Sequence, residues 1–351
     1  MTTTFAYDPI EQKHNQPGHE ENNCRTSTSM ALLQKWNLLE EMVALPVNSI
    51  TPEQLQLVHV ESYVQKVREL EESGGGMWDF ETYVVPGTFA AALKSAGAAI
   101  DVTRAVVSGQ ARNGISIMRP PGHHALPDNA MGFCFFANAA LAARAAQMEM
   151  GLERVLIIDW DVHHGNGTEA IFYDDPSVAF ISLHQHPLWP GTGMVEDVGV
   201  GPGRGYTMNI PMPPYTGDRG YLRAFDELIT PFARHFQPQL VIISSGFDVH
   251  WRDPLSHMNM TSTGYAQLAR RARILAEELC DGRLVILLEG GYDMGAVSHG
   301  VLNSVLALLG RDDEFHDPFD DPPTPEADVS DLITQLQRVH RNNLFGKNLS
   351  Q

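Results

Sequence analysis

Cysteine and positive charge are both scarce in this sequence. Its 351 residues include only three cysteines, Cys24, Cys134 and Cys280. Their odd number and wide spacing argue against a disulfide framework and a paired-cysteine metal site. Lysine and arginine total 24 against 43 aspartate and glutamate residues, so the formal net charge is -19. Because duplex nucleic acid is bound mainly through cationic surface, we expect no nucleic-acid partner.

Long apolar segments are missing as well. No run is long enough to span a bilayer, so we expect no membrane partner. The N-terminal segment 1–15 is polar and lacks the apolar region of a secretory signal. Unpaired cysteines are typical of a reducing compartment, and the sequence therefore predicts a cytoplasmic protein. The glycine-rich stretches 74–76 and 199–203 lack a following Gly-Lys-Ser/Thr, which excludes a phosphate-binding loop.

The chain does have what a large α/β domain needs. Hydrophobic residues make up 43% of it, and its length allows one well-buried domain over residues 1–351. Apolar runs predict buried strands at 115–118, 155–159, 179–183, 240–244 and 284–288. Helical patterns are expected at 89–108, 137–150, 219–236 and 264–279. This alternation predicts a mostly parallel sheet with helices on both faces.

The C-terminal part has a different composition. Residues 311–327 are acidic and contain several prolines, which predicts an exposed connection. Residues 328–351 follow as a C-terminal helix and tail, with the helix at about 329–341. This end either packs on the domain or serves oligomerisation, and the sequence leaves both open.

The most informative stretch is 159–167, which reads DWDVHHGNG and directly follows the expected strand 155–159. Two carboxylates and a histidine therefore gather at the end of a strand, where α/β sheets build their sites. Buried carboxylates are costly unless they are paired or bound to a metal. Aspartate and neutral imidazole together suit a divalent ion such as zinc.

Three other strand ends carry titratable groups. Residues 119–124 read RPPGHH, residues 244–248 read SSGFD, and residues 289–292 read EGGY. Each segment directly follows one of the predicted strands. The tandem His123 and His124 on a Pro-Gly turn are expected to point to different sides, so that at least one of them faces a cleft.

These four segments contain the parts of a metal-dependent hydrolase. A catalytic zinc needs three protein ligands and one open position, and Asp161, His163 and Asp248 supply that set. Water activated by the metal needs a general base, which His123 or His124 can provide. A donor for the developing oxyanion is also needed, and Tyr292 can supply it. The combination predicts metal-assisted hydrolysis of an amide.

Seven motifs stand in order along the chain: RPPGHHA, MGFC, DWDVHHGNGT, SLHQ, PGTG, SGFD and EGGY. In them the sequence resembles the histone deacetylase family, and within it the class II branch and its bacterial histone deacetylase-like amidohydrolases. The resemblance runs from about His14 to about Leu309. It implies the three-layer arginase/deacetylase fold, a single zinc at Asp161, His163 and Asp248, and a homo-oligomer.

The resemblance also assigns roles around the metal. His123 and His124 match the paired catalytic histidines, with His124 as the general base. Asp159 would support His123, and Asn166 would support His124. Asparagine at 166 is the class II choice, and it leaves His124 less basic than a carboxylate partner would. Tyr292 matches the tyrosine that polarises the substrate carbonyl, which argues for real activity.

Two potassium sites are further implied by the resemblance. The inner one would use residues beside the zinc strand, several of them through carbonyl oxygens. Its residues are Asp159, Asp161, His163, Ser182 and Leu183. An outer site would use carbonyls around Phe172, Asp175 and Val178.

Substrate contacts follow from the same resemblance. Gly132, Phe133 and Trp189 match the walls of an apolar channel for an acyl-lysine side chain, where aromatic faces sandwich methylene groups. Gly291 belongs to the same set of substrate-binding positions. Leu255 stands where polyamine-specific relatives carry an acidic gatekeeper, which favours acyl-lysine over an acetylated polyamine.

Acidic residues near the channel leave that choice open. Glu81 stands about where the family holds the substrate backbone, and Asp79 is a rival for this place. Glu20 and Glu21 in the first loop could also reach the rim. That loop resembles the family's His-Glu-Arg pattern but lacks its prolines, so we expect a different shape or mobility, with Arg25 buried beneath the site.

Rival functions make different demands on the sequence. A second substrate class is an acetylpolyamine or another small amide. A binuclear manganese ureohydrolase would need a further aspartate two positions after Asp248, where His250 stands. A non-catalytic acyl-lysine binder would not need the full set of His123, His124 and Tyr292. His164 has no assigned role, and we expect it to pack beneath the site.

Overall fold

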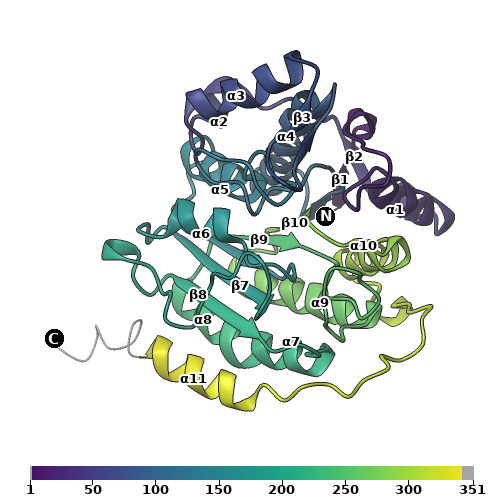
Figure 1. Ribbon diagram of the computed structural model, residues 1–351. Coiled ribbons are helices and arrows are strands. Elements are labelled where there is room, and N and C mark those ends of the chain that lie inside the picture. Colours follow the sequence, from purple (N-terminus) through teal and green to yellow (C-terminus); the bar gives the residue numbers. More distant parts are fainter. Residues whose placement is uncertain (1, 342–351) are drawn as a thin grey trace.

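The computed structural model describes residues 2–341 of the chain. An eight-stranded sheet lies at its centre (Figure 1). Its strands are β1 (Thr3–Ala6), β2 (Val43–Leu45), β5 (Asn113–Ser116), β6 (Val155–Asp159), β7 (Val178–Gln185), β8 (Thr207–Met212), β9 (Leu240–Ser245) and β10 (Leu284–Leu288). They lie in the order β2-β1-β5-β10-β9-β6-β7-β8, and every neighbouring pair is parallel. A separate antiparallel pair consists of β3 (Gly76–Met77) and β4 (Tyr83–Val84).

Helices cover both faces of the sheet. One face packs against α4 (Thr88–Val107), α5 (Asn138–Met148) and α6 (Asn166–Phe172). The other face packs against α1 (Cys24–Lys35), α7 (Asp218–Ala224), α8 (Thr230–Phe236), α9 (Ser262–Leu279), α10 (Met294–Leu309) and α11 (Ser330–His340). The predicted parallel sheet with two helical layers is therefore confirmed.

Shorter segments complete the chain. The helices α2 (Pro52–Leu55) and α3 (Glu61–Glu72) pack on the outside of α4 and α5, around a third apolar cluster (Figure 1). Single turns of 3-10 helix are η1 (Pro9–Lys13), η2 (Leu38–Glu40), η3 (Gly201–Gly203) and η5 (Asp312–Glu314). A π-helical turn, η4 (Phe225–Ile229), joins α7 to α8.

The strands form where the sequence has apolar residues at consecutive positions. In β6, Val155 and Ile157 face the layer of α4 and α5, whereas Leu156 and Ile158 face the opposite core. All four side chains are fully buried. A parallel strand that is covered on both faces needs apolar residues on both of its sides. For this reason the central strands could be predicted as unbroken apolar runs.

Several boundaries differ from the prediction. β5 lies at Asn113–Ser116 rather than at 115–118, because after one last backbone bond from Ile117 to Ala6 (2.9 Å) the chain leaves the sheet. The helix expected at 219–236 is two helices with a π-helical turn between them. Pro231 cannot donate a backbone hydrogen bond, which accounts for the wider turn before α8. The strands β1, β2 and β8 were not predicted, because they are short or rich in polar residues.

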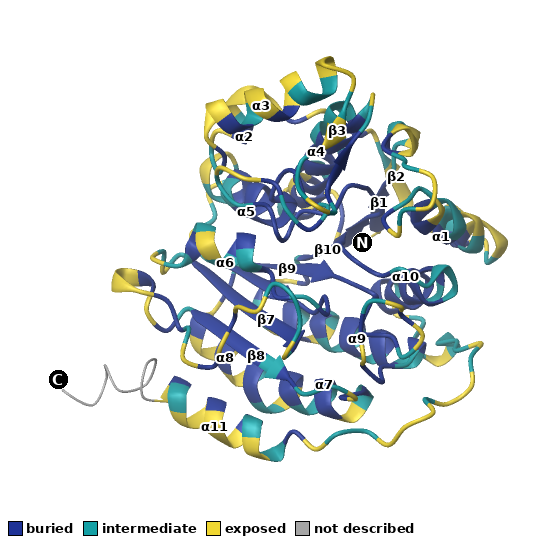
Figure 2. Ribbon diagram, viewed as in Figure 1, coloured by how far each residue is buried: buried dark blue, intermediate teal, exposed yellow. Residues whose placement is uncertain are grey.

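The C-terminal connection runs along the outside of the molecule to α11. Figure 2 shows it as a largely exposed or half-buried segment. In α11 the side chains of Ile333 and Leu336 are buried in the large core on that face of the sheet. This helix therefore packs on the domain, while residues 342–351 of the expected tail lie outside the described residues. Among residues 2–341, none of the helices combines the length and apolar character needed to cross a membrane.

Candidate active site

The carboxyl ends of four adjacent strands form the base of the candidate site. In the sheet, β5, β10, β9 and β6 are consecutive neighbours. They lead into the segments 119–124, 289–292, 246–248 and 160–167, respectively. Because parallel strands all end at the same edge, these segments meet there although they are far apart in the sequence.

Asp161, His163 and Asp248 form a compact group of potential metal ligands. One ligand atom from each residue lies within 4.8 Å of the other two. His163 Nδ1 is 3.1 Å from Asp161 Oδ1 and 3.4 Å from Asp248 Oδ2. Asp248 Oδ2 is buried and accepts no hydrogen bond from any residue within 2–341. A divalent cation fits this set, because it would satisfy the unpaired oxygen and hold two buried carboxylates together.

Backbone amides and glycines hold these carboxylates in place. The amide of Val162 donates to Asp248 Oδ1 at 2.9 Å, and that of Gly290 donates to Asp161 Oδ2 at 2.7 Å. A Cβ atom on Gly290 would lie 2.2 Å from Asp248 Oδ2, and one on Gly246 would lie 2.2 Å from Asp161 Oδ2. The glycines in both segments are therefore required by the close approach of the carboxylates.

The electrostatics of this group favour a bound cation. Burial and the neighbouring Asp161 raise the pKa of Asp248 to about 6. Burial alone would lower the pKa of His163, but its contacts with Asp161 and Asp248 outweigh it and raise that pKa to about 10. Both shifts have the same origin, namely two carboxylates in a dry site. A divalent ion would neutralise that charge and leave His163 free to act as a neutral ligand.

His123 and His124 lie side by side above the group. Their ring centroids are 3.8 Å apart, so the expectation that the two side chains point to different sides was wrong. The cause is a contact that the local sequence does not reveal. The carboxylate of Glu289 accepts the backbone N–H groups of Gly122 (2.7 Å) and His123 (3.2 Å) and thereby sets the turn. Glu289 also accepts the hydroxyl of Ser244 at 3.0 Å.

The two histidines have different partners and different charges. His123 Nδ1 is 2.9 Å from Asp159 Oδ2, and His124 Nδ1 is 2.8 Å from Asn166 Oδ1. Burial lowers the pKa of His123, but Asp161 and Asp159 outweigh it and raise the pKa to about 10. Burial and the neighbouring His123 hold the pKa of His124 well below its usual value. These surroundings favour the protonated form of His123 and the neutral form of His124.

A cavity of about 170 Å³ leads from the surface to these groups. It is lined by Glu81, His124, Gly132, Phe133, His163, Leu188, Trp189, Leu255 and Tyr292. Five of the six expected substrate-binding residues are among them. Gly291 is the exception, because it is buried and its carbonyl accepts a hydrogen bond from Arg25 Nε at 2.6 Å. Leu188 lines the cavity but was not predicted.

Aromatic side chains and one glycine shape the channel. Trp189 lies edge-on to His124 with ring centroids 4.7 Å apart, and Phe133 lies 5.8 Å from the ring of Tyr292. Gly132 has a φ of +56°, and a Cβ atom there would lie 2.4 Å from His124 Cδ2 and 2.7 Å from the Trp189 ring. Only glycine lets the backbone pass this close to both rings.

Tyr292 is oriented by residues outside the channel. Asp253 Oδ2 accepts its backbone N–H at 2.7 Å, and the guanidinium carbon of Arg25 lies 5.1 Å from its ring centroid. Burial raises the pKa of the Tyr292 hydroxyl well above its usual value, so the group stays a hydrogen-bond donor. The role of Asp253 was missed, although the Asp-Pro pair at 253–254 was a signal that could have drawn attention to it.

The acidic residues near the rim behave differently from one another. Glu81 lines the channel, and its Oε1 is buried without a hydrogen bond from any described residue. Asp79 folds back on its own loop and accepts the amides of Glu81 (2.9 Å) and Thr82 (2.6 Å). Glu20 is exposed but does not line the channel. Glu21 is fully buried, so the idea that it reaches the rim was wrong.

The residues expected at the potassium sites lie around β6 and β7. Asp159 pairs with Ser182 across β6 and β7, and Leu183 follows in β7. In the turn between α6 and β7, the amide of Asp175 donates to the carbonyl of Phe172 at 3.1 Å, and Val178 begins β7. Potassium binding at either site stays a prediction.

Two other histidines lie outside the channel. His164 is buried, with Nδ1 2.8 Å from Thr192 Oγ1, as expected for a residue that packs beneath the site. His250 accepts the amide of Arg252 at 3.2 Å through Nδ1, and its Nε2 faces Ser262 Oγ at 3.3 Å. It therefore does not provide a ligand for a second metal next to Asp248.

Comparisons with known proteins agree with this geometry. A family model described as "Histone deacetylase domain" matches residues 19–308. A "Probable deacetylase" of Archaeoglobus fulgidus is 43% identical over 316 residues, which cover 89% of this chain and 88% of that protein. A "Histone deacetylase-like amidohydrolase" of Pseudomonas aeruginosa is 39% identical over 305 residues, with coverages of 87% and 80%. The solved structure titled "Crystal Structure of HDA15 HD domain" matches with a TM-score of 0.89 and 32% identity, covering 100% of this chain and 99% of its own.

Proposed function

The chain belongs to the histone deacetylase family, and from this premise we propose that it is a zinc-dependent amidohydrolase that removes acetyl or longer acyl groups from the ε-amine of lysine in peptides and proteins. One observation carries the proposal. The bottom of a single narrow channel brings together a metal-ligand group, a neutral histidine and a tyrosine hydroxyl.

The ligand set is the basis for proposing zinc. Asp161, His163 and Asp248 combine carboxylate and imidazole donors, and His163 faces the channel. When bound, zinc makes water easier to deprotonate at neutral pH and draws electron density from a carbonyl oxygen. Iron(II) also accepts such donors, so elemental analysis of the purified protein is needed to identify the resident metal.

His124 is the residue that moves the proton. Its Nδ1 faces the amide oxygen of Asn166, so Nδ1 carries the hydrogen and Nε2 has a free lone pair. Nε2 accepts a proton from the attacking water as the new C–O bond forms, and gives it to the lysine nitrogen as the C–N bond breaks. Asp161 and Asp159 favour the protonated form of His123, which stabilises negative charge nearby without taking the proton.

Tyr292 acts on the substrate carbonyl. Its hydroxyl stays protonated and donates a hydrogen bond to the oxygen as negative charge develops there. Phe133 and Trp189 exclude water from the stem of the substrate, which strengthens this interaction. The residues of this chain thus supply the base, the oxyanion donor and the substrate channel.

The channel walls support acyl-lysine as the substrate. Phe133 and Trp189 line the channel with apolar aromatic surface that can pack against a methylene chain, and Leu255 offers no charge to a distant ammonium group. An acetylated polyamine is the second candidate, and one observation favours it. The carboxylate of Glu81 lines the channel with one oxygen unpaired, and it could accept hydrogen bonds from an amine.

A side-by-side comparison of rates tests the proposal. We would measure kcat/KM of the zinc-loaded protein on acetyl-lysine peptides, longer acyl-lysine peptides and acetylated polyamines, with Tyr292→Phe as the inactive control. We expect the highest value on an acyl-lysine peptide, and a loss of kcat of about 10² to 10³ in the control. A higher kcat/KM on acetylated polyamines would favour the second candidate substrate instead. Equal turnover by the tyrosine variant would contradict the oxyanion role.

Two further expectations concern the state of the protein. A cytoplasmic location and a homo-oligomer stay predictions. Size-exclusion chromatography with light scattering measures the oligomeric state directly, and a monomer at micromolar concentration would contradict the second expectation. A non-catalytic acyl-lysine binder would show binding without turnover in the same rate assays.

A further inference from the structure

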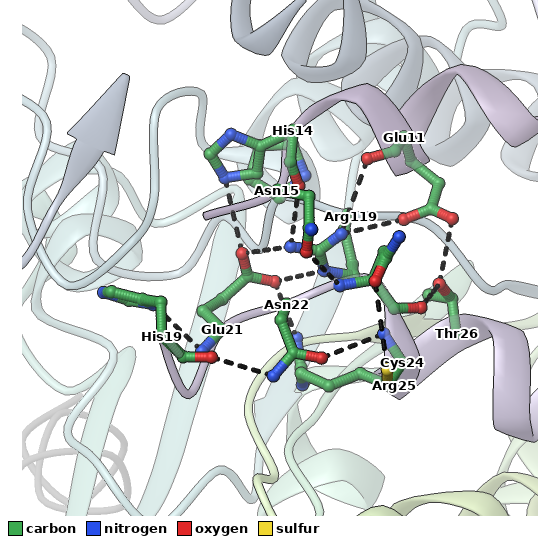
Figure 3. Close-up of polar contacts among 12 residues, drawn as sticks. Glu11, His14, Asn15, His19, Glu21, Asn22, Cys24, Arg25, Thr26 and Arg119 are labelled. Atoms are coloured by element: carbon green, nitrogen blue, oxygen red, sulfur yellow. Dashed lines mark hydrogen bonds and ion pairs between the residues drawn. The ribbon is translucent and has the colours of Figure 1, made fainter. Parts of the chain in front are cut away.

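Glu21 lies at the centre of a fully buried network of charged side chains behind the active site. Figure 3 shows its carboxylate between two arginines that come from different parts of the chain. Its Oε1 is 3.1 Å from Arg25 Nη1 and also accepts a bond from Arg119 Nε. Its Oε2 is 2.5 Å from Arg119 Nη2 and 3.3 Å from His14 Nε2. One carboxylate thus pairs with both arginines at once.

Arg25 leads from this carboxylate to the catalytic tyrosine. Its Nε donates to the carbonyl of Gly291 at 2.6 Å, and its Nη2 donates to the carbonyl of Glu289. Its guanidinium group also lies against the ring of Tyr292, 5.1 Å from the centroid. The planar guanidinium therefore holds the segment 289–292 at three points, and its third nitrogen is held by Glu21.

Arg119 leads from the same carboxylate to the catalytic histidines. It directly precedes the turn 120–124, which contains His123 and His124. Its side chain is fully buried, and it also pairs with Glu11 Oε2 at 3.0 Å and with the carbonyl of His14 at 3.1 Å. Arg119 is thus held by two carboxylates. Within residues 2–341, the ion pair of Arg25 is with Glu21 alone.

We infer that Glu21 is a positioning residue for Tyr292, acting through Arg25. The inference rests on the proposed deacylase activity for its effect on rate. Without the carboxylate, the buried guanidinium of Arg25 has no counter-charge, and it would turn towards other acceptors or water. The carbonyls of Glu289 and Gly291 would lose their donor, and the hydroxyl of Tyr292 would no longer be held at one distance from the substrate carbonyl.

The electrostatics of the network agree with a permanently charged Glu21. Burial raises the pKa of its carboxyl, but Arg119 and His14 outweigh this and hold the pKa well below its usual value. Two carboxylates, Glu11 and Glu21, face two arginines, so the network is balanced in charge. Replacing either glutamate by glutamine removes one formal negative charge from the network.

Glu11 provides a matched control because of this symmetry. Like Glu21 it is fully buried and pairs with Arg119, but on its other side it accepts the hydroxyl of Thr26 at 2.9 Å rather than a bond from Arg25. Glu11→Gln and Glu21→Gln therefore make the same chemical change against the same partner. They differ in that Glu21→Gln also removes the carboxylate partner of Arg25 and the ion pair with His14.

The experiment compares these two variants in the full-length, zinc-loaded protein. We would measure kcat and KM on an acetyl-lysine peptide, bound zinc, and hydrogen–deuterium exchange of the segment 289–293. For Glu21→Gln we expect kcat to fall by at least about tenfold, KM to change by less than about threefold, and exchange in 289–293 to become faster. For Glu11→Gln we expect kcat within about threefold of the unmodified protein and unchanged exchange in this segment.

Adding Tyr292→Phe separates positioning from general loss of structure. Once the hydroxyl is absent, Glu21→Gln should lower the residual kcat by less than about twofold, because there is no donor left to misplace. A purely structural defect would lower the rate equally in both backgrounds, and that result would overturn the inference. Equal losses of kcat in Glu21→Gln and Glu11→Gln would overturn it as well.

The exchange measurement keeps this inference distinct from the proposed function. If the unmodified protein hydrolyses none of the acylated substrates, the proposed function fails, while faster exchange limited to Glu21→Gln would still support the structural link. If the protein is active but the exchange of 289–293 is the same in all variants, the inference fails alone. Should Glu21→Gln not fold, Glu21→Asp keeps the charge and shortens the reach, and the same comparison applies.

Discussion

His124 Nδ1 lies 2.8 Å from the amide oxygen of Asn166, a neutral partner, whereas the adjacent His123 is paired with the carboxylate of Asp159 at 2.9 Å. The carboxylate favours a protonated His123, whereas burial and the neighbouring His123 keep His124 neutral and Asn166 adds no counter-charge. The orientation of the Asn166 amide is supported from its other side, where Nδ2 contacts Met131 Sδ at 3.4 Å. Burial and the absence of a carboxylate partner therefore suit His124 to the proposed role of base.

Replacing Asn166 by aspartate should therefore change the pH dependence of the rate. A carboxylate favours the protonated imidazole and raises the pKa of His124 from the low value that burial and His123 impose. As the pH falls, His124 then becomes protonated, and stops acting as a base, at a higher pH than in the unmodified protein. The acidic limb of the kcat/KM profile therefore moves to higher pH, and activity falls several-fold on the acid side of neutrality. Asn166→Ala is the control, and an acidic limb that moves equally in both variants would contradict the charge argument.

Removing one metal ligand should abolish both metal binding and activity. In Asp248→Ala the carboxylate whose Oδ2 has no other partner is missing, and two ligands remain. We expect bound zinc to fall below one equivalent and kcat/KM to fall by more than about a hundredfold. Elemental analysis and activity would be measured on the same sample, with Tyr292→Phe as a variant that keeps its zinc. Full activity in metal-depleted protein would rule out a zinc mechanism, and two manganese ions per chain would favour a ureohydrolase.

Much of this site could be predicted, because the relevant information is local in the sequence. The central strands are unbroken apolar runs, and their ends carry the carboxylates and histidines directly. The relative orientation of His123 and His124 could not be predicted, since it depends on Glu289, which is 166 positions from His123. Asp253 was missed for the same reason. It holds the backbone of Tyr292 from 39 positions away.

Glycine at position 132 should be essential for an open channel. An added methyl group would lie 2.4 Å from His124 and 2.7 Å from Trp189, so both rings would have to move. We expect Gly132→Ala to lower kcat/KM by at least about tenfold. The control is Gly109→Ala, which has a similar φ of +76° but nothing within 4 Å of the added atom. Both variants should lose about 1 kcal/mol of stability from the left-handed backbone, and only the first should lose activity.

The charge at the rim should decide between the two substrate classes. Leu255 lines the channel together with Glu81, so a second carboxylate there would create an anionic mouth. We expect Leu255→Glu to raise kcat/KM on an acetylated polyamine by about tenfold and to lower it on an acetyl-lysine peptide. Leu255→Gln has nearly the same shape without the charge, and it should leave the ratio of the two rates close to that of the unmodified protein. A polyamine rate that rises equally in both variants would show that shape, and not charge, is responsible.

His59 should contribute to the acid sensitivity of the fold. Its ring is buried, its Nε2 accepts the amide of Ala137 at 2.9 Å, and its Nδ1 faces the carbonyl of Leu126 at 3.1 Å. The ring is therefore neutral, with its hydrogen on Nδ1. Burial is the main cause that lowers its pKa to about 4, against hydrogen bonds to backbone carbonyls that act in the opposite direction.

The sign of the effect follows from proton binding. Between a pKa of about 6.5 in the unfolded chain and about 4 in the folded protein, the unfolded state holds the extra proton. The stability that neutral His59 contributes is thus complete above the pKa of the unfolded chain. It is lost as the pH falls towards the pKa of the folded protein. The slope for one such group is at most about 1.4 kcal/mol per pH unit.

The substitution His59→Gln isolates this contribution. Its amide can accept from Ala137 and donate to Leu126, but it does not titrate. We would measure the free energy of unfolding by urea from about pH 7.5 to about pH 4.5. As the pH falls, the variant should lose less of this free energy than the unmodified protein does. The control is His257→Gln at an exposed position. Because His250 and His340 also have lowered pKa values, they contribute equally to both proteins and cancel in the difference. Parallel curves for His59→Gln and the unmodified protein would contradict the prediction.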